Sequence, residues 1–172
     1  MRELTFKGYL LSQLQELSEV KTTSLYTFSY IAENNARLKD TLCLYLVLFT
    51  RENLRNKLLK KYIFLAEDCN FLKNLTIDNI HLFFSENNLS QYKTIYENYL
   101  YMHNKKTNTD KIKAIMYSKI LEVKNLKNIT NYRIYTTLKL NPGNANAFLK
   151  NGDISKVSLN TTRQILQFVN EY

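Results

Sequence analysis

The scarcity of residues that interrupt helices is the strongest constraint on this chain. Its 172 residues include only three Gly and one Pro. Folds built from many tight turns need such residues repeatedly, whereas helices need them only at their ends. Hydrophobic residues make up 45% of the chain, which is enough for a buried core and argues against global disorder. We therefore expect an all-α fold, either one domain or a helical body with a small appended module.

Apolar residues recur at helical spacing through the first 103 residues, which predicts a multi-helix bundle. The longest apolar run, Leu42 to Phe49, is apolar on every side and is typical of a central helix. Downstream, Leu54, Leu58, Tyr62 and Leu65 predict one further amphipathic helix. Residues 1–103 are thus expected to form a body for dimerisation, effector binding or contact with a partner.

Residues 104–109 form a polar segment without a large apolar residue, and we interpret them as a linker. They separate a helix capped by Ser90 from a helix beginning at Asp110. The second of these helices is expected to face inward through Ile112, Ile115, Met116, Ile120 and Val123. Residues 110–172 would then form a separate C-terminal module.

The C-terminal module contains the only Pro and two of the three Gly, which predicts three short helices after residue 128. The first covers about residues 130–138 and ends in a tight connection at residues 139–141. Asn141 is a good N-cap for the second helix, and Pro142 suits its first position. Gly152 supplies a left-handed stop after Asn151, and Ser158 caps the last helix.

The second of these short helices has two different faces. Ala145, Phe148 and Leu149 share one face and are expected to pack inward. The opposite face is small and polar, and it consists of Gly143, Asn144, Asn146, Ala147 and Lys150. A narrow helix of this kind fits a major groove about 12 Å wide, where Asn can pair with adenine. Its N-terminus, at Asn141 and Gly143, can approach a phosphate or a base edge.

The order of a helix, a three-residue turn, an Asn-Pro-Gly-initiated helix ending in Leu149-Lys150-Asn151-Gly152 and a Ser-capped closing helix resembles the helix-turn-helix of Cro/phage-repressor-type (Xre-like) regulators. The resemblance covers about 45 of the 172 residues. In that family the second helix of the motif reads bases. Transferred by position, the resemblance implies base contacts by Asn144, Asn146 and Lys150.

Positive charge is concentrated in the C-terminal module. Residues 110–172 hold ten basic and four acidic residues, a net charge of +6 within a total of +9. Such a positive field favours the binding of polyanions. The alternative is that the lysines only keep the protein soluble, as they do in many proteins. Four basic residues are candidates for DNA phosphate contacts, which position a protein and make its binding sensitive to salt. They are Arg133, Lys139, Lys156 and Arg163.

The small number of cysteines, the lack of a recognisable leader and the shortness of the apolar runs indicate a reduced, cytoplasmic protein. Cys43 and Cys69 are the only cysteines, both lie in apolar stretches, and core packing is their expected role. The chain does not begin with a recognisable secretory leader. A run of eight apolar residues falls short of the roughly twenty that cross a bilayer, so no membrane association is expected.

The sequence offers no catalytic or metal-binding pattern, and we expect a protein that is not an enzyme and binds no cofactor. His81 and His103 lack Cys or His partners at zinc-ligand spacing. No nucleotide-binding glycine loop and no serine nucleophile motif occurs.

Two functional hypotheses follow. The first is a sequence-specific double-stranded DNA-binding protein that regulates transcription, acting as a homodimer because one short helix reads only a few base pairs. The second is a protein-binding helical adaptor or inhibitor from a mobile element, antitoxin-like or related to phage defence. Salt dependence separates the two, because phosphate contacts weaken steeply as salt increases.

Overall fold

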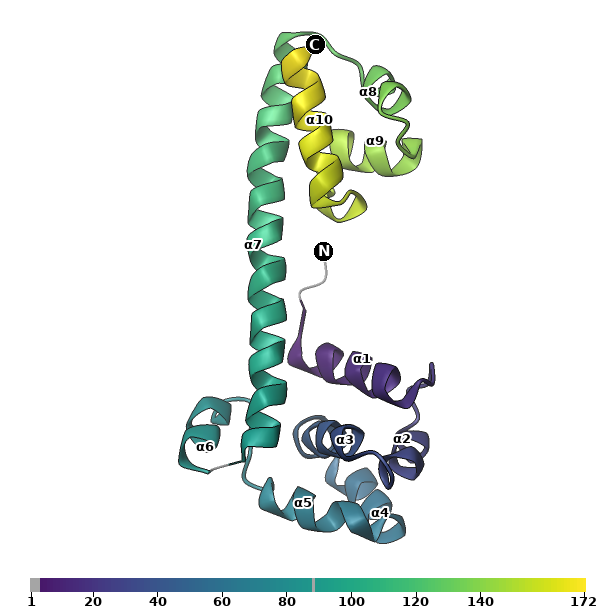
Figure 1. Ribbon diagram of the computed structural model, residues 1–172, viewed down its shortest axis with the longest axis vertical. Helices are drawn as coiled ribbons and strands as arrows, with labels where there is room; N and C mark the ends of the chain where they lie inside the picture. The colour runs from purple at the N-terminus through teal and green to yellow at the C-terminus, as the bar shows by residue number, and fades with distance from the viewer. Residues whose placement is uncertain (1–3, 88) are drawn as a thin grey trace. The chain divides into compact units, whose positions relative to one another are not determined.

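The computed structural model describes residues 4–87 and 89–172, which contain ten α-helices, two 3₁₀ turns and no β-strand (Figure 1). The expected all-α fold is therefore confirmed. The chain divides into two compact units, residues 4–103 and residues 104–172. Within the described residues, none of the helices combines the length and the apolar character needed to cross a membrane.

The first unit consists of six helices and the beginning of a seventh. Their bounds are α1 Phe6–Ser18, α2 Leu25–Ala32, α3 Ala36–Phe49, α4 Glu52–Lys61, α5 Ala66–Phe71, α6 Ile80–Glu86 and the first part of α7, Ser90–Leu126. Side-chain caps begin several of them, because Thr5, Ser24 and Asn35 each accept a hydrogen bond from an amide three residues ahead.

Helix α3 lies at the centre of the first unit, as its apolar run predicted. It packs against α1, α2 and α5. Its side chains at Leu38, Leu42, Cys43, Leu44 and Leu46 have no exposed surface. A helix apolar on several sides reaches this burial only when neighbours cover those sides.

The prediction of a single helix from Leu54 to Leu65 is wrong, because α4 ends at Lys61. Tyr62 leaves the helical conformation (φ −116°, ψ 75°), a 3₁₀ turn covers Ile63–Leu65, and α5 then begins at Ala66. The break allows Leu58 and Leu65 to be buried together while Ile63 remains 76% exposed. Burial in the core therefore decided the path of the chain, and helical spacing alone did not reveal it.

The helix break expected around residues 104–109 does not occur, since these residues lie inside the 37-residue helix α7. The segment is polar, but residues 90–126 contain no Gly and no Pro. Asn, Lys and Thr on a solvent-exposed helix cost only fractions of a kcal/mol each. The hydroxyl of Thr109 also donates to the carbonyl of Lys105 one turn earlier, at 2.9 Å, as helical threonines commonly do.

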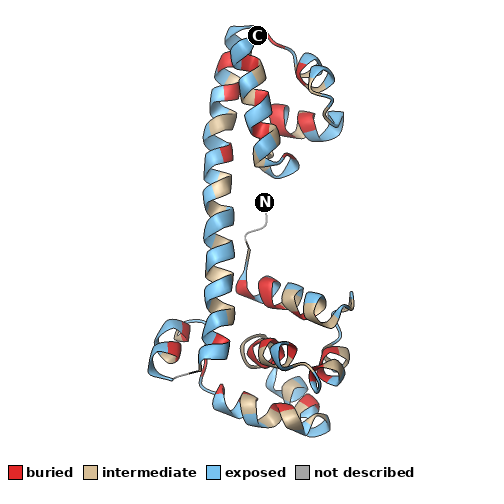
Figure 2. Cartoon of the chain, in the orientation of Figure 1, coloured by how far each residue is buried: buried red, intermediate tan, exposed pale blue. Residues whose placement is uncertain are grey.

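The second unit consists of the rest of α7 with three shorter helices and one 3₁₀ turn. Their bounds are α8 Asn131–Thr137, α9 Pro142–Asn151, η2 Ile154–Lys156 and α10 Leu159–Glu171. Its core includes Ile120 of α7, Ile134 of α8, Phe148 of α9 and Ile165 of α10, all fully buried. Figure 2 shows the buried sides of α9 and α10 in red.

Candidate nucleic-acid interface

Helices α8 and α9 meet through a tight turn that the backbone closes by itself. The amide of Leu138 donates to Ile134 at 3.0 Å, and the amide of Leu140 donates to Tyr135 at 2.8 Å. Lys139 occupies the left-handed region between them, with φ 54°. This is the usual way to end a helix, although a glycine is more common at such a position. Lys139 is exposed on this turn.

Both ends of α9 have the expected capping chemistry. Oδ1 of Asn141 accepts a hydrogen bond from the amide of Asn144 at 3.0 Å, and Pro142 takes the first helical position. At the other end Gly152 adopts φ 71°, and its amide donates to Phe148 at 3.0 Å. The predicted bounds of this helix, Pro142 to Asn151, are confirmed.

The two faces of α9 differ in burial as the residue pattern indicated. Ala145, Phe148 and Leu149 are between 0% and 2% exposed and join the core of the unit. Asn144 and Lys150 are exposed, whereas Asn146 is half-buried. Of the three candidate base-contacting residues, two are therefore fully available to solvent and one only in part.

The first turn of α9 retains one backbone amide for a ligand. Pro142 has no N–H, and the Asn144 amide is already bonded to Asn141. Gly143 thus supplies the remaining N–H of that turn. A Cβ at Gly143 would lie 3.3 Å from Oδ1 of Asn141, so a larger residue would press on the cap itself.

The four candidate phosphate-contacting residues come from four different elements. Arg133 lies on α8, Lys139 on the turn, Lys156 on η2 and Arg163 on α10, and all four are exposed. The Arg133 guanidinium stacks on the ring of Tyr172, 5.0 Å from its centre, at the end of α10. Arg163 borders a shallow groove that also contains Glu171, so the field around it is mixed.

An acidic residue follows α9 directly. Asp153 Oδ1 accepts hydrogen bonds from the hydroxyl and the amide of Ser155, at 2.5 Å and 3.1 Å. The hydroxyl bond is the main reason that the pKa of Asp153 falls below its ordinary value. Asp153 is therefore a fixed negative charge that organises η2 and offsets part of the charge of nearby Lys156.

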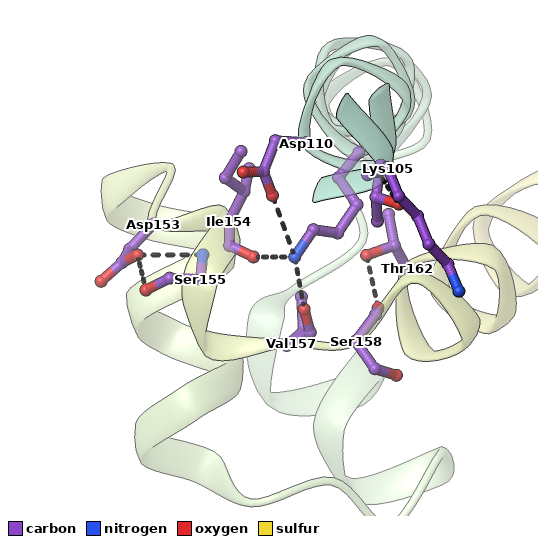
Figure 3. A network of polar contacts seen from close by, with 10 residues as sticks. Lys105, Asp110, Asp153, Ile154, Ser155, Val157, Ser158 and Thr162 are labelled. Atoms are coloured by element: carbon purple, nitrogen blue, oxygen red, sulfur yellow. Dashed lines mark hydrogen bonds and ion pairs between the residues drawn. The ribbon is translucent and has the colours of Figure 1, made fainter. Parts of the chain in front are cut away.

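Lys113 of α7 connects this module in a way that the sequence pattern did not reveal. Its residue is only 7% exposed, and its Nζ donates to the carbonyls of Ile154 at 2.6 Å and Val157 at 3.1 Å. Asp110 lies 3.9 Å from the same ammonium group. Figure 3 shows these acceptors and Asp110 around the connection between α9 and α10. The lysine thereby fastens that connection to α7.

The prediction of which apolar residues of α7 face inward is therefore partly wrong. Ile120 and Val123 are buried, but Ile112 and Ile115 are 41% and 72% exposed. Lys113 points inward instead, because the carbonyls of the α9–α10 connection need a donor at that place. The helical spacing of Lys113, Tyr117 and Ile120 could have placed Lys113 on the buried face of α7. A search for apolar residues alone does not find it, because lysine is not apolar.

A second lysine anchors the closing helix. Nζ of Lys127 donates to the carbonyls of Val169 and Asn170, at 3.0 Å and 2.7 Å. These are among the last carbonyls of α10, which have no partner within the helix. The positive charge also suits the negative end of the helix dipole.

The part of the chain that the structure describes contains no cluster of three or more His, Cys, Asp or Glu side chains placed to hold a metal ion. Comparison of the chain with protein-family models, with curated proteins and with solved structures gives no match.

Proposed function

We propose that the chain binds double-stranded DNA in a sequence-specific manner through residues 104–172 and regulates transcription, without catalysing a reaction. The observation that carries the proposal is the form of α9. The helix follows a tight turn, buries Phe148 and Leu149, and turns Asn144 and Lys150 to solvent. A short helix with a small polar outer face can enter a major groove.

In this proposal α9 reads bases with the side chains of its outer face. The amide group of Asn144 can donate to and accept from adenine at the same time, and the ammonium group of Lys150 can donate to guanine. Asn146 contributes through the part of its side chain that remains accessible. The Gly143 amide, aided by the positive end of the helix dipole, can donate a hydrogen bond to a phosphate oxygen.

The basic residues around α9 supply the electrostatic part of the affinity. Lys139 on the turn and Lys156 on η2 flank α9 in the chain on either side. Arg133 and Arg163 extend the positive charge over α8 and α10. Each phosphate that such a residue neutralises releases counterions, so affinity falls as salt increases.

We further propose that two copies bind one DNA site. The ten residues of α9 are about 15 Å long, so one copy reaches only a few base pairs of the groove. Two copies related by a twofold axis would read both halves of a palindrome. Residues 1–103 would contribute the contact between copies or with a protein partner. Sedimentation of the complex with a single duplex tests this directly, since one bound copy contradicts it.

The proposal is tested by fluorescence anisotropy of the full chain on labelled duplexes. One duplex has a random sequence and the other comes from the region upstream of the chain's own gene, and both are titrated at two salt concentrations. We expect binding that weakens steeply between low and moderate salt and that prefers the upstream duplex. Absence of binding to either duplex at low salt would contradict DNA binding.

Substitutions on α9 separate base reading from phosphate binding. Asn144→Ala or Asn146→Ala should weaken binding to a selected site by about 1–3 kcal/mol and relax the preference at one base pair. Lys150→Ala should do the same if the ammonium group contacts a base. Asn160→Ala, an exposed Asn on α10, and Lys60→Ala on α4 are matched controls. Equal effects of variants and controls would contradict the assignment of α9.

A protein-binding adaptor or inhibitor is the second candidate, and exposed apolar side chains on α7 favour it. Ile115 is 72% exposed and Leu126 is 79% exposed, although both are large hydrophobic residues of the second unit. A mainly apolar protein interface would weaken much less with salt than a DNA complex. Binding of a protein that persists at high salt, with no DNA affinity, would favour this candidate.

A further inference from the structure

The two cysteines of the chain meet in the first unit, far apart in sequence. Cys43 lies on α3 and Cys69 on α5, two helices that pack against each other. Both are free thiols, 0% and 4% exposed. The two thiols lie within hydrogen-bonding reach of each other.

The register that brings the thiols together is held by a neighbouring ion pair. Nζ of Lys39 lies 3.0 Å from the carboxylate of Asp68. Lys39 is one turn before Cys43 on α3, and Asp68 directly precedes Cys69 on α5. The same face of α3 therefore contacts α5 twice, once through charges and once through sulfur atoms.

The thiol of Cys69 borders a cavity in the first unit. Cys69 lines a cavity of about 260 Å³ together with Arg55, Asn56 and Lys73. This volume holds several water molecules, so a reactant of similar size can enter it. Cys43 is fully buried.

The polar surroundings distinguish the chemistry of the two sulfur atoms. The hydrogen bond from Cys43 is the main reason that the pKa of Cys69 falls below its ordinary value. Burial opposes this shift, and the positive charge of Arg55 adds to it. The Arg55 guanidinium is held in place by the carbonyls of Leu46 and Val47, at 3.4 Å and 3.3 Å. The same thiol–thiol bond and burial raise the pKa of Cys43. Of the two thiols, Cys69 therefore ionises more readily, and it is also the one beside the cavity.

We propose that Cys43 and Cys69 are a redox-active pair, which a small hydroperoxide reaching Cys69 through the cavity oxidises to a disulfide. The Cys69 sulfur attacks one peroxide oxygen, the O–O bond breaks, and with hydrogen peroxide one water leaves and a sulfenic acid forms. The Cys43 sulfur then attacks the Cys69 sulfur, and a second water leaves. In total two thiols lose two hydrogens, and one hydrogen peroxide becomes two waters.

The geometry suits this second step. The two sulfur atoms already lie next to each other, and a disulfide requires them to approach to about 2.05 Å. The disulfide would link α3 to α5 across the turn at Tyr62. It would also replace the thiol that borders the cavity, so oxidation would alter the lining beside Arg55.

The test exposes the full native chain to hydrogen peroxide, followed by denaturation, thiol counting and intact mass measurement. We expect both thiols to disappear, the mass to fall by about 2 Da, and a peptide map to join Cys43 to Cys69 within one chain. Reaction in urea should be slower, because unfolding separates the thiols and removes Arg55. Two surviving thiols, a disulfide between chains, or equal rates in urea would overturn the proposal.

Two variants assign the roles of the sulfur atoms. In Cys43→Ser, Cys69 should stop at the sulfenic acid, which dimedone captures. In Cys69→Ser, Cys43 should remain a thiol at the same peroxide concentration. The opposite pattern would overturn the assignment of Cys69 as the first nucleophile. If either variant fails to fold, the mass and peptide map of the unaltered chain still decide whether the pair forms.

Discussion

Replacing Lys113 with methionine tests whether one buried ammonium group holds the C-terminal module together. Methionine keeps most of the apolar stem, so the substitution removes mainly the charge and two hydrogen bonds, to Ile154 at 2.6 Å and to Val157 at 3.1 Å. Bonds of this charged kind contribute about 1.5–3 kcal/mol each. The ion pair with Asp110, at a distance of 3.9 Å, adds little to the stability.

Two effects reduce the total below the sum of the bonds. Ile154 is half-buried, so water can replace the lost donor there, whereas the carbonyl of buried Val157 loses its partner. Removing the ammonium also removes the cost of burying a charge. We therefore expect Lys113→Met to destabilise the module by about 2–4 kcal/mol.

Amide hydrogen exchange of the full chain measures this locally, which avoids a two-state assumption for a chain with two units. Peptides covering residues 145–160 should exchange roughly 30- to 900-fold faster in Lys113→Met. Lys111→Met is the matched control, because Lys111 is exposed on the same helix and the change in charge is identical. Unchanged exchange in Lys113→Met would refute the reasoning. It would mean that the free-energy cost of burying the ammonium group is as large as the stabilisation from its hydrogen bonds.

Three further outcomes are expected. Tyr92→Phe should raise the free energy of unfolding by about 1 kcal/mol in urea titration, because the buried Tyr92 hydroxyl has no hydrogen-bond partner among the described residues. A lower free energy of unfolding in the variant would contradict this, since it would mean that the hydroxyl makes a stabilising contact. Gly152→Ala should cost about 1–2 kcal/mol, measured by thermal unfolding, since φ is 71° and a Cβ would lie 3.4 Å from the Tyr117 ring. Asp40→Asn should stabilise the chain at neutral pH, because burial raises the pKa of Asp40 and so disfavours its charged form in the folded state. The difference in the free energy of unfolding between the variant and the unaltered chain should shrink as the pH falls through the raised pKa and Asp40 takes up a proton. Urea titrations at several pH values measure this difference, and a difference that stays constant would contradict the prediction.

The sequence by itself determined the local features of this protein. Few Gly and Pro residues gave an all-helical chain, because little else interrupts helical hydrogen bonding. The bounds of α9 followed from Asn141, Pro142 and Gly152, whose capping chemistry operates within three or four residues. The inward face of α9 followed from helical spacing, since three apolar residues on one side have to leave water. The residues named for the candidate interface rest on the same local pattern.

Only the tertiary structure decided which groups meet across long separations in sequence. The inward direction of Lys113 depends on carbonyls about 40 residues later, which no periodicity within α7 reveals. The contact of Cys43 with Cys69 depends on the break at Tyr62, which sets where α5 packs on α3. Capping and helical spacing are short-range effects that a sequence displays directly. Burial and the satisfaction of buried polar groups depend on the whole packed unit, and therefore only the fold reveals them.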